Sequence, residues 1–195
     1  MDQAMINVKW CVSLLNGLAS AGVSQLVISP GSRSTPLVIA ADLHPAFDCH
    51  VLVDERSAAF FALGMARRHN APVALICTSG SAAANWYPAV VEASHSFVPL
   101  VLLTADRPWE LQSCGANQTI DQIKLFGDQV NSFHALPPAE ASPASLSRLH
   151  ALGRQVVNES LWPAAGPVHI NMPFREPLVP AHCCLDVDEV EVSLP

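Results

Sequence analysis

Short, continuous runs of apolar residues recur along this chain, and each run is followed by polar residues and then by a segment with helical spacing. Strands that alternate with helices in this way are typical of a parallel sheet that is covered on both faces. The predicted strands are 25–28, 51–53, 73–77, 100–104, 130–135 and 168–172. We therefore predict an α/β fold, a three-layer α/β/α domain with a mostly parallel central sheet.

The segments between these strands carry apolar residues at helical spacing. The predicted helices are 6–21, 37–43, 56–69, 82–93, 121–126 and 144–159, with a bend expected at Pro88. We assign residues 1–178 to one domain. The remaining residues, 179–195, are rich in proline and acid and contain no closing element, so we interpret them as the start of an interdomain linker.

Polar residues gather at the carboxyl ends of the predicted strands, which is where ligands bind in open parallel sheets. These ends hold the segments 29–35, 54–56, 78–80, 106–108 and 173–175. Because the carboxyl ends of parallel strands lie on one edge of the sheet, we expect these segments to form a common rim.

Composition limits the possible partners. Only 14% of the residues are charged and 50% are apolar, which predicts faces that another domain or subunit covers. A net charge of −7 and only ten Lys and Arg argue against nucleic acid. No apolar run is long enough for a membrane span, and the N-terminus lacks the features of a signal peptide, so we expect a cytoplasmic location.

Cysteine and histidine spacing argues against a metal site in this chain. The six cysteines include no C-x-x-C pair, and the eight histidines are scattered. We interpret the cysteines as reduced structural thiols and predict no metal ligand. A Ser-His-Asp triad is not indicated either, since no G-x-S-x-G elbow is present.

Glu55 stands between the predicted strand 51–53 and the apolar helix 56–69. A buried carboxylate needs a partner, which is either an arginine in a structural ion pair or a ligand nitrogen that exchanges a proton with it. Adjacent residues that leave a strand point in different directions, so Arg56 is a poor partner. The residues alone leave both interpretations open.

The other rim segments also have two interpretations. The hydroxyls, backbone amides and Arg33 of the loop 29–36 suit an anion at a helix N-terminus, but an ordinary capped turn has similar residues. The segment 78–81 is a helix cap whose glycine permits close backbone approach. Arg107 is either a surface charge or a second rim cation, and the amides in 115–118 are either solvated or turned to a ligand.

Six segments together resemble a known family. They are ISPGSRSTP at 28–36, DER at 54–56, TSG at 78–80, LTADRP at 103–108, GANQ at 115–118 and HINMPF at 169–174. In this order they resemble the N-terminal pyrimidine-binding (Pyr) domain of thiamine-diphosphate-dependent enzymes. Within that superfamily the chain is similar to the SEPHCHC synthases of menaquinone biosynthesis, which are decarboxylating transferases.

The resemblance implies roles that the residues alone do not show. Glu55 would be catalytic, because in this family it hydrogen-bonds the ring nitrogen of the aminopyrimidine and so promotes loss of the thiazolium proton. The implied cofactor-binding residues are Glu55, Pro30, Thr78, Gly80 and Asn117. The implied substrate-binding residues, for 2-oxoglutarate and isochorismate, are Ser32, Arg33, Arg107, Asn117 and Gln118.

The resemblance also implies that this chain needs partners. The family holds magnesium and the cofactor's diphosphate on a C-terminal domain with a Gly-Asp-Gly … Asn motif, which is absent here. The active site forms with that domain of a partner subunit in a homodimer or homotetramer, so we expect this chain to be inactive alone. Two alternatives are the Pyr domain of another 2-oxo-acid decarboxylase or carboligase, and a stand-alone flavodoxin-like binding module.

Overall fold

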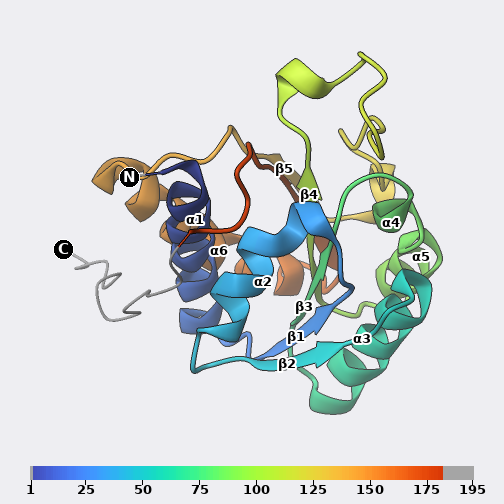
Figure 1. Cartoon of the computed structure of the whole chain (residues 1–195). Coiled ribbons are helices and arrows are strands. Elements are labelled where there is room, and N and C mark those ends of the chain that lie inside the picture. Colours follow the sequence, from blue (N-terminus) through green and yellow to red (C-terminus); the bar gives the residue numbers. More distant parts are fainter. Residues whose placement is uncertain (1, 182–195) are drawn as a thin grey trace.

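The computed structural model describes residues 2–181 and shows a six-stranded, all-parallel sheet between two layers of helices (Figure 1). The strands are β1 (Gln25–Ile28), β2 (Asp48–Val51), β3 (Val73–Cys77), β4 (Leu100–Asp106), β5 (Ser132–Ala135) and β6 (Pro167–Pro173). The helices are α1 (Gln3–Ser20), α2 (Thr35–Asp42), α3 (Glu55–His69), α4 (Ser81–Ala84), α5 (Tyr87–His95) and α6 (Pro143–Leu161), with the 3-10 helices η1 (Ser32–Ser34), η2 (Trp109–Leu111) and η3 (Gly127–Gln129). The predicted three-layer α/β fold is confirmed.

The strand order β2-β1-β3-β4-β6-β5 places a switch point between β1 and β3. From β1 the chain moves outward to β2, and it then returns to the other side of β1 to form β3. The loops that follow β1 and β3 therefore leave the sheet in opposite directions. A ligand crevice is expected at this point in an open α/β sheet.

Two apolar clusters, one on each face, hold the layers together. Helices α1, α2 and α6 cover one face, and α3, α4 and α5 cover the other (Figure 1). Successive side chains of β1 point to opposite faces of the sheet. Leu26 and Ile28 pack in the cluster under α1, whereas Val27 packs in the cluster under α3. Four of the five buried residues of α3 are alanines, which let this helix lie close to the sheet.

The strand before Glu55 differs from the prediction. It is β2, Asp48–Val51, rather than a buried strand over 51–53, and Val51 and Val53 are 67% and 82% exposed. The physical reason is its position at the sheet edge. Because β2 pairs only with β1, its ladder ends where Val51 lies opposite Ile28.

Two predicted helices are also different. The segment 82–93 forms two helices, α4 and α5, and Pro88 lies in the first turn of α5, where its missing N–H costs no hydrogen bond. Residues 121–126 form turns instead of a helix. There the Asp121 carboxylate accepts from the Ile123 amide at 2.9 Å and Lys124 has φ +55°, which together stop helical winding.

Several other expectations concern what the chain contains. Within residues 2–181 no helix is long and apolar enough to cross a membrane. The four described cysteines are free thiols, and the described part of the chain holds no cluster of metal-ligating side chains. Most of the tail predicted to be a linker, residues 182–195, lies outside the described residues.

Candidate functional site

Glu55 is the first residue of α3. Asp54 caps the helix by accepting from the Ser57 amide at 2.7 Å, and Glu55 follows in the first turn, where the helix dipole favours a negative charge. Its half-buried carboxylate has neither a hydrogen bond nor an ion pair within residues 2–181. The structural ion pair with an arginine is therefore not formed among these residues.

The carboxylate of Glu55 lies near the carboxyl end of β3. Burial raises the pKa of the Cys77 thiol at that end, and the charge of Glu55 raises it further. Thr78 follows Cys77 directly, so Glu55 and the loop after β3 share one part of the rim. An acceptor with no partner at this place is suited to a ligand that presents a nitrogen donor.

The loops after β1 and β3 touch each other at the switch point. A Cβ atom on Gly31 would lie 2.3 Å from Cβ of Thr78, so only glycine permits this approach. Pro30 and Ser32 are exposed on the outer side of the same loop. They line a hollow of 520 Å³ between α2 and the end of β2.

Arg33 points inward from η1. Its Nη1 donates to the carbonyl of Phe174 and its Nη2 donates to the Glu176 carboxylate, both at 2.9 Å. The residue is 6% exposed, and its Nε is buried without a hydrogen-bond partner among the described residues. Arg33 thus ties η1 to the end of β6, a structural role that its sequence context did not predict.

Arg107 comes from the end of β4 and lies beside the loop after β3. Its Nη1 donates to the Ser79 hydroxyl and, at 2.7 Å, to the carbonyl of Gln118. Its Nη2 and Nε make no hydrogen bond within the described residues. Burial, followed by the nearby charge of Arg33, lowers the pKa of Arg107. The two guanidinium charges therefore act on each other at this rim.

Gly80 and Gln118 are in direct contact. Gly80 has φ +80°, and a Cβ there would lie 2.9 Å from both Cγ and the carbonyl oxygen of Gln118. The Gln118 side chain donates to the carbonyl of Ser79 at 3.1 Å. Asn117 precedes it, and its side chain is exposed. The loop that carries Asn117 and Gln118 is thereby fixed against the loop after β3.

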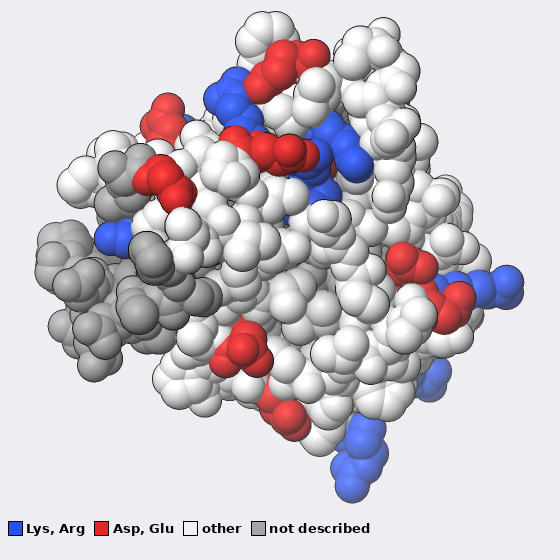
Figure 2. All heavy atoms as spheres, viewed as in Figure 1, with Lys and Arg blue, Asp and Glu red and all other residues white. Residues whose placement is uncertain are grey.

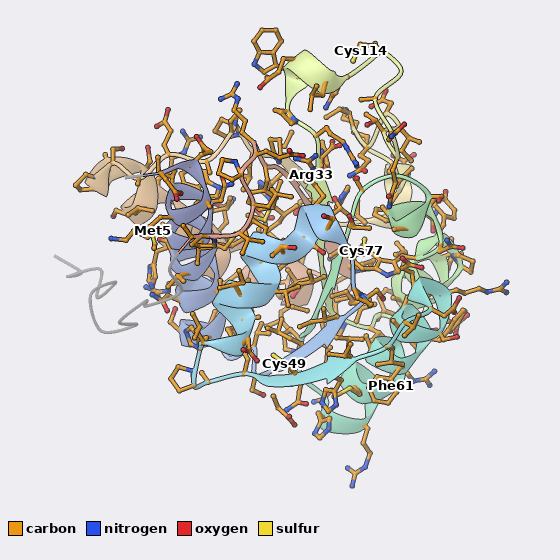
Figure 3. All side chains as sticks on the ribbon, viewed as in Figure 1. Met5, Arg33, Cys49, Phe61, Cys77 and Cys114 are labelled. Carbon is orange, nitrogen blue, oxygen red and sulfur yellow. The ribbon has the colours of Figure 1, made fainter. Side chains whose placement is uncertain are left out.

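Several of the segments predicted to form the rim lie side by side in the structure. Charged side chains of both signs gather beside the base of the loop that projects after β4, while much of this face carries none (Figure 2). Arg33 lies near the base of that loop and Cys114 near its tip (Figure 3). Gly80, Arg107 and Gln118 meet at this base, and Thr78 contacts Gly31 in the loop after β1. Glu55 acts electrostatically on Cys77, which precedes Thr78, whereas Pro30, Ser32 and Asn117 are exposed.

Sequence reasoning missed a buried polar side chain at this rim. Gln122 is 1% exposed and bonds the backbone of Gly80 and Ala105 and the side chain of Asn171. The segment around it has little periodicity, so its residue types gave no sign of burial.

Comparison with known proteins identifies the family. Residues 12–125 match the model of the thiamine pyrophosphate enzyme, N-terminal TPP binding domain. The chain belongs to this family. Its sequence-based resemblance to the Pyr domain is confirmed.

Curated relatives share one name, 2-succinyl-5-enolpyruvyl-6-hydroxy-3-cyclohexene-1-carboxylate (SEPHCHC) synthase. The protein of Dechloromonas aromatica is 46% identical over 197 residues, which cover 100% of this chain and 36% of that relative. The protein of Geobacillus kaustophilus is 53% identical over 171 residues, which cover 88% of this chain and 30% of the relative. The chain thus spans about a third of the length of the curated relatives it matches.

Proposed function

We propose that this Pyr domain supplies the pyrimidine side of a thiamine diphosphate site in a SEPHCHC synthase. The Glu55 carboxylate, which has no partner within residues 2–181, carries the proposal, because it would accept a hydrogen bond from a protonated ring nitrogen without first breaking a bond to those residues. When bound, thiamine diphosphate supplies a carbon nucleophile and an electron sink for decarboxylation of a 2-oxo acid. Pro30, Thr78, Gly80 and Asn117 would surround the cofactor.

The substrates in this proposal are 2-oxoglutarate and isochorismate, both of which carry carboxylates. Arg107 is the better placed of the two arginines, because its Nη2 and Nε are free of hydrogen bonds within the described part of the chain. A forked guanidinium donates two parallel bonds to a carboxylate. Arg33 would add charge nearby, and Ser32, Asn117 and Gln118 would add polar contacts.

The rest of the active site would come from a partner subunit. We propose that magnesium and the cofactor's diphosphate are held by a different domain of that subunit, in a cytoplasmic homodimer or homotetramer. The exposed side of α3 supports this, since Phe60 and Phe61 are 41% and 42% exposed there. An apolar helix face of this kind is typical of a protein contact.

The test is Glu55→Gln in the longer protein of which we propose this chain is part. The amide cannot accept a proton from the cofactor, so hydrogen–deuterium exchange at the thiazolium carbon should slow by at least about 100-fold. Cofactor affinity, measured by calorimetry, should fall far less. The matched control is Glu92→Gln on α5, an exposed glutamate that should leave exchange unchanged. Exchange at the wild-type rate in Glu55→Gln would refute the proposed function.

A further inference from the structure

Gln122 joins three separate segments of the rim. Its Oε1 accepts from the Gly80 amide at 2.8 Å, and its Nε2 donates to the Ala105 carbonyl at 3.2 Å and to Asn171 Oδ1 at 2.8 Å. A primary amide has two N–H donors, and both are used here. The side chain therefore connects the end of β3 to the end of β4 and to β6.

The connection continues through Asn171 to the backbone of Arg107. Asn171 Nδ2 donates to Asp106 Oδ2 at 2.7 Å, and the other Asp106 oxygen accepts from the Arg107 amide, also at 2.7 Å. All three side chains, of Gln122, Asn171 and Asp106, are at most 3% exposed. Buried polar groups linked in this way resist rotation, because each bond broken would leave a group unsatisfied.

Gly80 and Arg107 are the two ends of this chain of hydrogen bonds. Gly80 is a proposed cofactor contact and Arg107 is a proposed substrate contact. Gly80 lies in the loop after β3, whereas Arg107 directly follows β4. On the solvent side, Arg107 also contacts Ser79 and Gln118 directly, and these contacts hold the same two loops together. The distance between the loop after β3 and the loop after β4 is thus set on the buried side by Gln122 and on the solvent side by Arg107.

We propose that Gln122 is a positioning residue, which holds Gly80 at a fixed place relative to Arg107 and so sets the substrate carboxylate against the cofactor. This inference rests on the proposed function. It adds that catalysis depends on a side chain that touches neither ligand. A displacement of about 1 Å between reacting groups can lower a rate by about 100-fold.

The first test is Gln122→Met in the longer protein, a change of similar volume that removes every hydrogen bond of the amide. We expect kcat per cofactor-loaded site to fall about 10- to 100-fold, and deuterium uptake of the peptide that contains Gly80 to rise. Exchange at the thiazolium carbon should stay at the wild-type rate, because Glu55 is untouched. Gln155→Met on the exposed side of α6 is the control and should change none of these quantities.

If Gln122→Met does not fold, Gln122→Glu tests the same positioning role. In Gln122→Glu the carboxylate still accepts from Gly80 but donates nothing until it is protonated, and the acid then donates one hydrogen bond in place of two. We therefore expect kcat to recover in part, relative to wild type, as the pH falls. The charged and titratable groups nearby are Asp106, Arg107, Asp121 and His169, and all four are present in both proteins. Thiazolium exchange should stay at the wild-type rate over the same pH range, whereas a general loss of structure would slow it as well.

The outcomes separate the inference from the function on which it rests. A wild-type kcat in a folded Gln122→Met, or a Gln122→Glu profile parallel to wild type, would overturn the positioning role alone. Unchanged thiazolium exchange in Glu55→Gln would overturn the proposed function instead.

Discussion

The Glu176 carboxylate lies 2.9 Å from Nη2 of Arg33, so the protein itself supplies a carboxylate to this rim arginine. The two partners differ in exposure, because the side chain of Arg33 is 7% exposed and that of Glu176 is 70% exposed. The pair is therefore open to exchange from the solvent side. A substrate carboxylate that is to bind Arg33 at Nη2 has to displace Glu176.

This competition predicts the effect of Glu176→Gln in the longer protein. An ion pair with an exposed partner is worth up to about 1 kcal/mol, so its loss should lower KM for a carboxylate substrate by up to about five-fold. Steady-state kinetics with each substrate would measure this. Glu110→Gln, which breaks the Arg175–Glu110 pair at the same rim, is the control and should leave KM unchanged. An unchanged KM in Glu176→Gln would show that Arg33 only ties η1 to β6.

Gly80→Ala should damage both the fold and the site. Alanine at φ +80° is strained, and its Cβ would meet Gln118 at 2.9 Å, so we expect a loss of about 1–3 kcal/mol in the free energy of unfolding. Gly115→Ala separates the two causes, because its φ is +77° but no atom lies within 4 Å of the new Cβ. Urea unfolding of both variants should show the larger loss for Gly80→Ala. Equal losses would mean that the contact with Gln118 adds nothing.

Phe61→Glu tests whether the exposed side of α3 is a subunit contact. Phe61 is 42% exposed and its ring lies 5.6 Å from that of His50 on β2, so the substitution places a charge on an apolar surface without entering the core. Sedimentation velocity should show weaker self-association. Phe97→Glu is the control, since Phe97 is 66% exposed and lies between α5 and β4, at the opposite end of the sheet from Glu55. Equal dissociation in both variants would argue against a specific contact at α3.

The sequence predicted those features that depend on local pattern. Apolar runs located the central strands, because β3 and β4 are buried along their whole length, and the rim followed from parallel topology. It misplaced β2, since the end of an edge strand depends on its register with β1. It also missed Gln122, because the burial of a polar residue depends on partners that are distant in sequence.

The prediction for Arg33 and Glu55 shows the same limit. Both were expected at the rim, and both lie there. The sequence could not show that Arg33 is engaged by Phe174 and Glu176, about 140 residues away, while Glu55 has no such partner among the residues described. Whether a rim charge is free for a ligand is a property of packing and not of local pattern.

His169 should make the stability of the protein depend on pH. The ring is fully buried between Phe126 and Phe133, and its Nε2 lies 2.7 Å from the Thr104 hydroxyl. Thr104 donates to Asn171 Oδ1, so it accepts from Nε2–H, and the ring is neutral with Nδ1 unprotonated. Burial lowers the pKa of His169 from 6.5 to about 3.

The sign of the effect follows from proton uptake. Between pH 6.5 and about 3 the unfolded chain binds a proton at His169 that the native protein does not, so acidification favours unfolding. The free energy of unfolding should fall by up to about 1.4 kcal/mol per pH unit in this range. Burial raises the pKa of Asp106, which acts in the opposite direction, but it does so equally with or without His169.

Urea unfolding of wild type and His169→Gln from pH 7 to pH 4 isolates the contribution of His169 to the pH dependence of the free energy of unfolding. Glutamine retains a donor for Thr104 but does not titrate, so the variant should lose less stability on acidification, even if it is less stable at pH 7. His95→Gln at the exposed end of α5 removes a histidine without removing a buried ring, and should follow the wild-type slope. Parallel slopes for wild type and His169→Gln would mean that the buried ring does not govern acid stability.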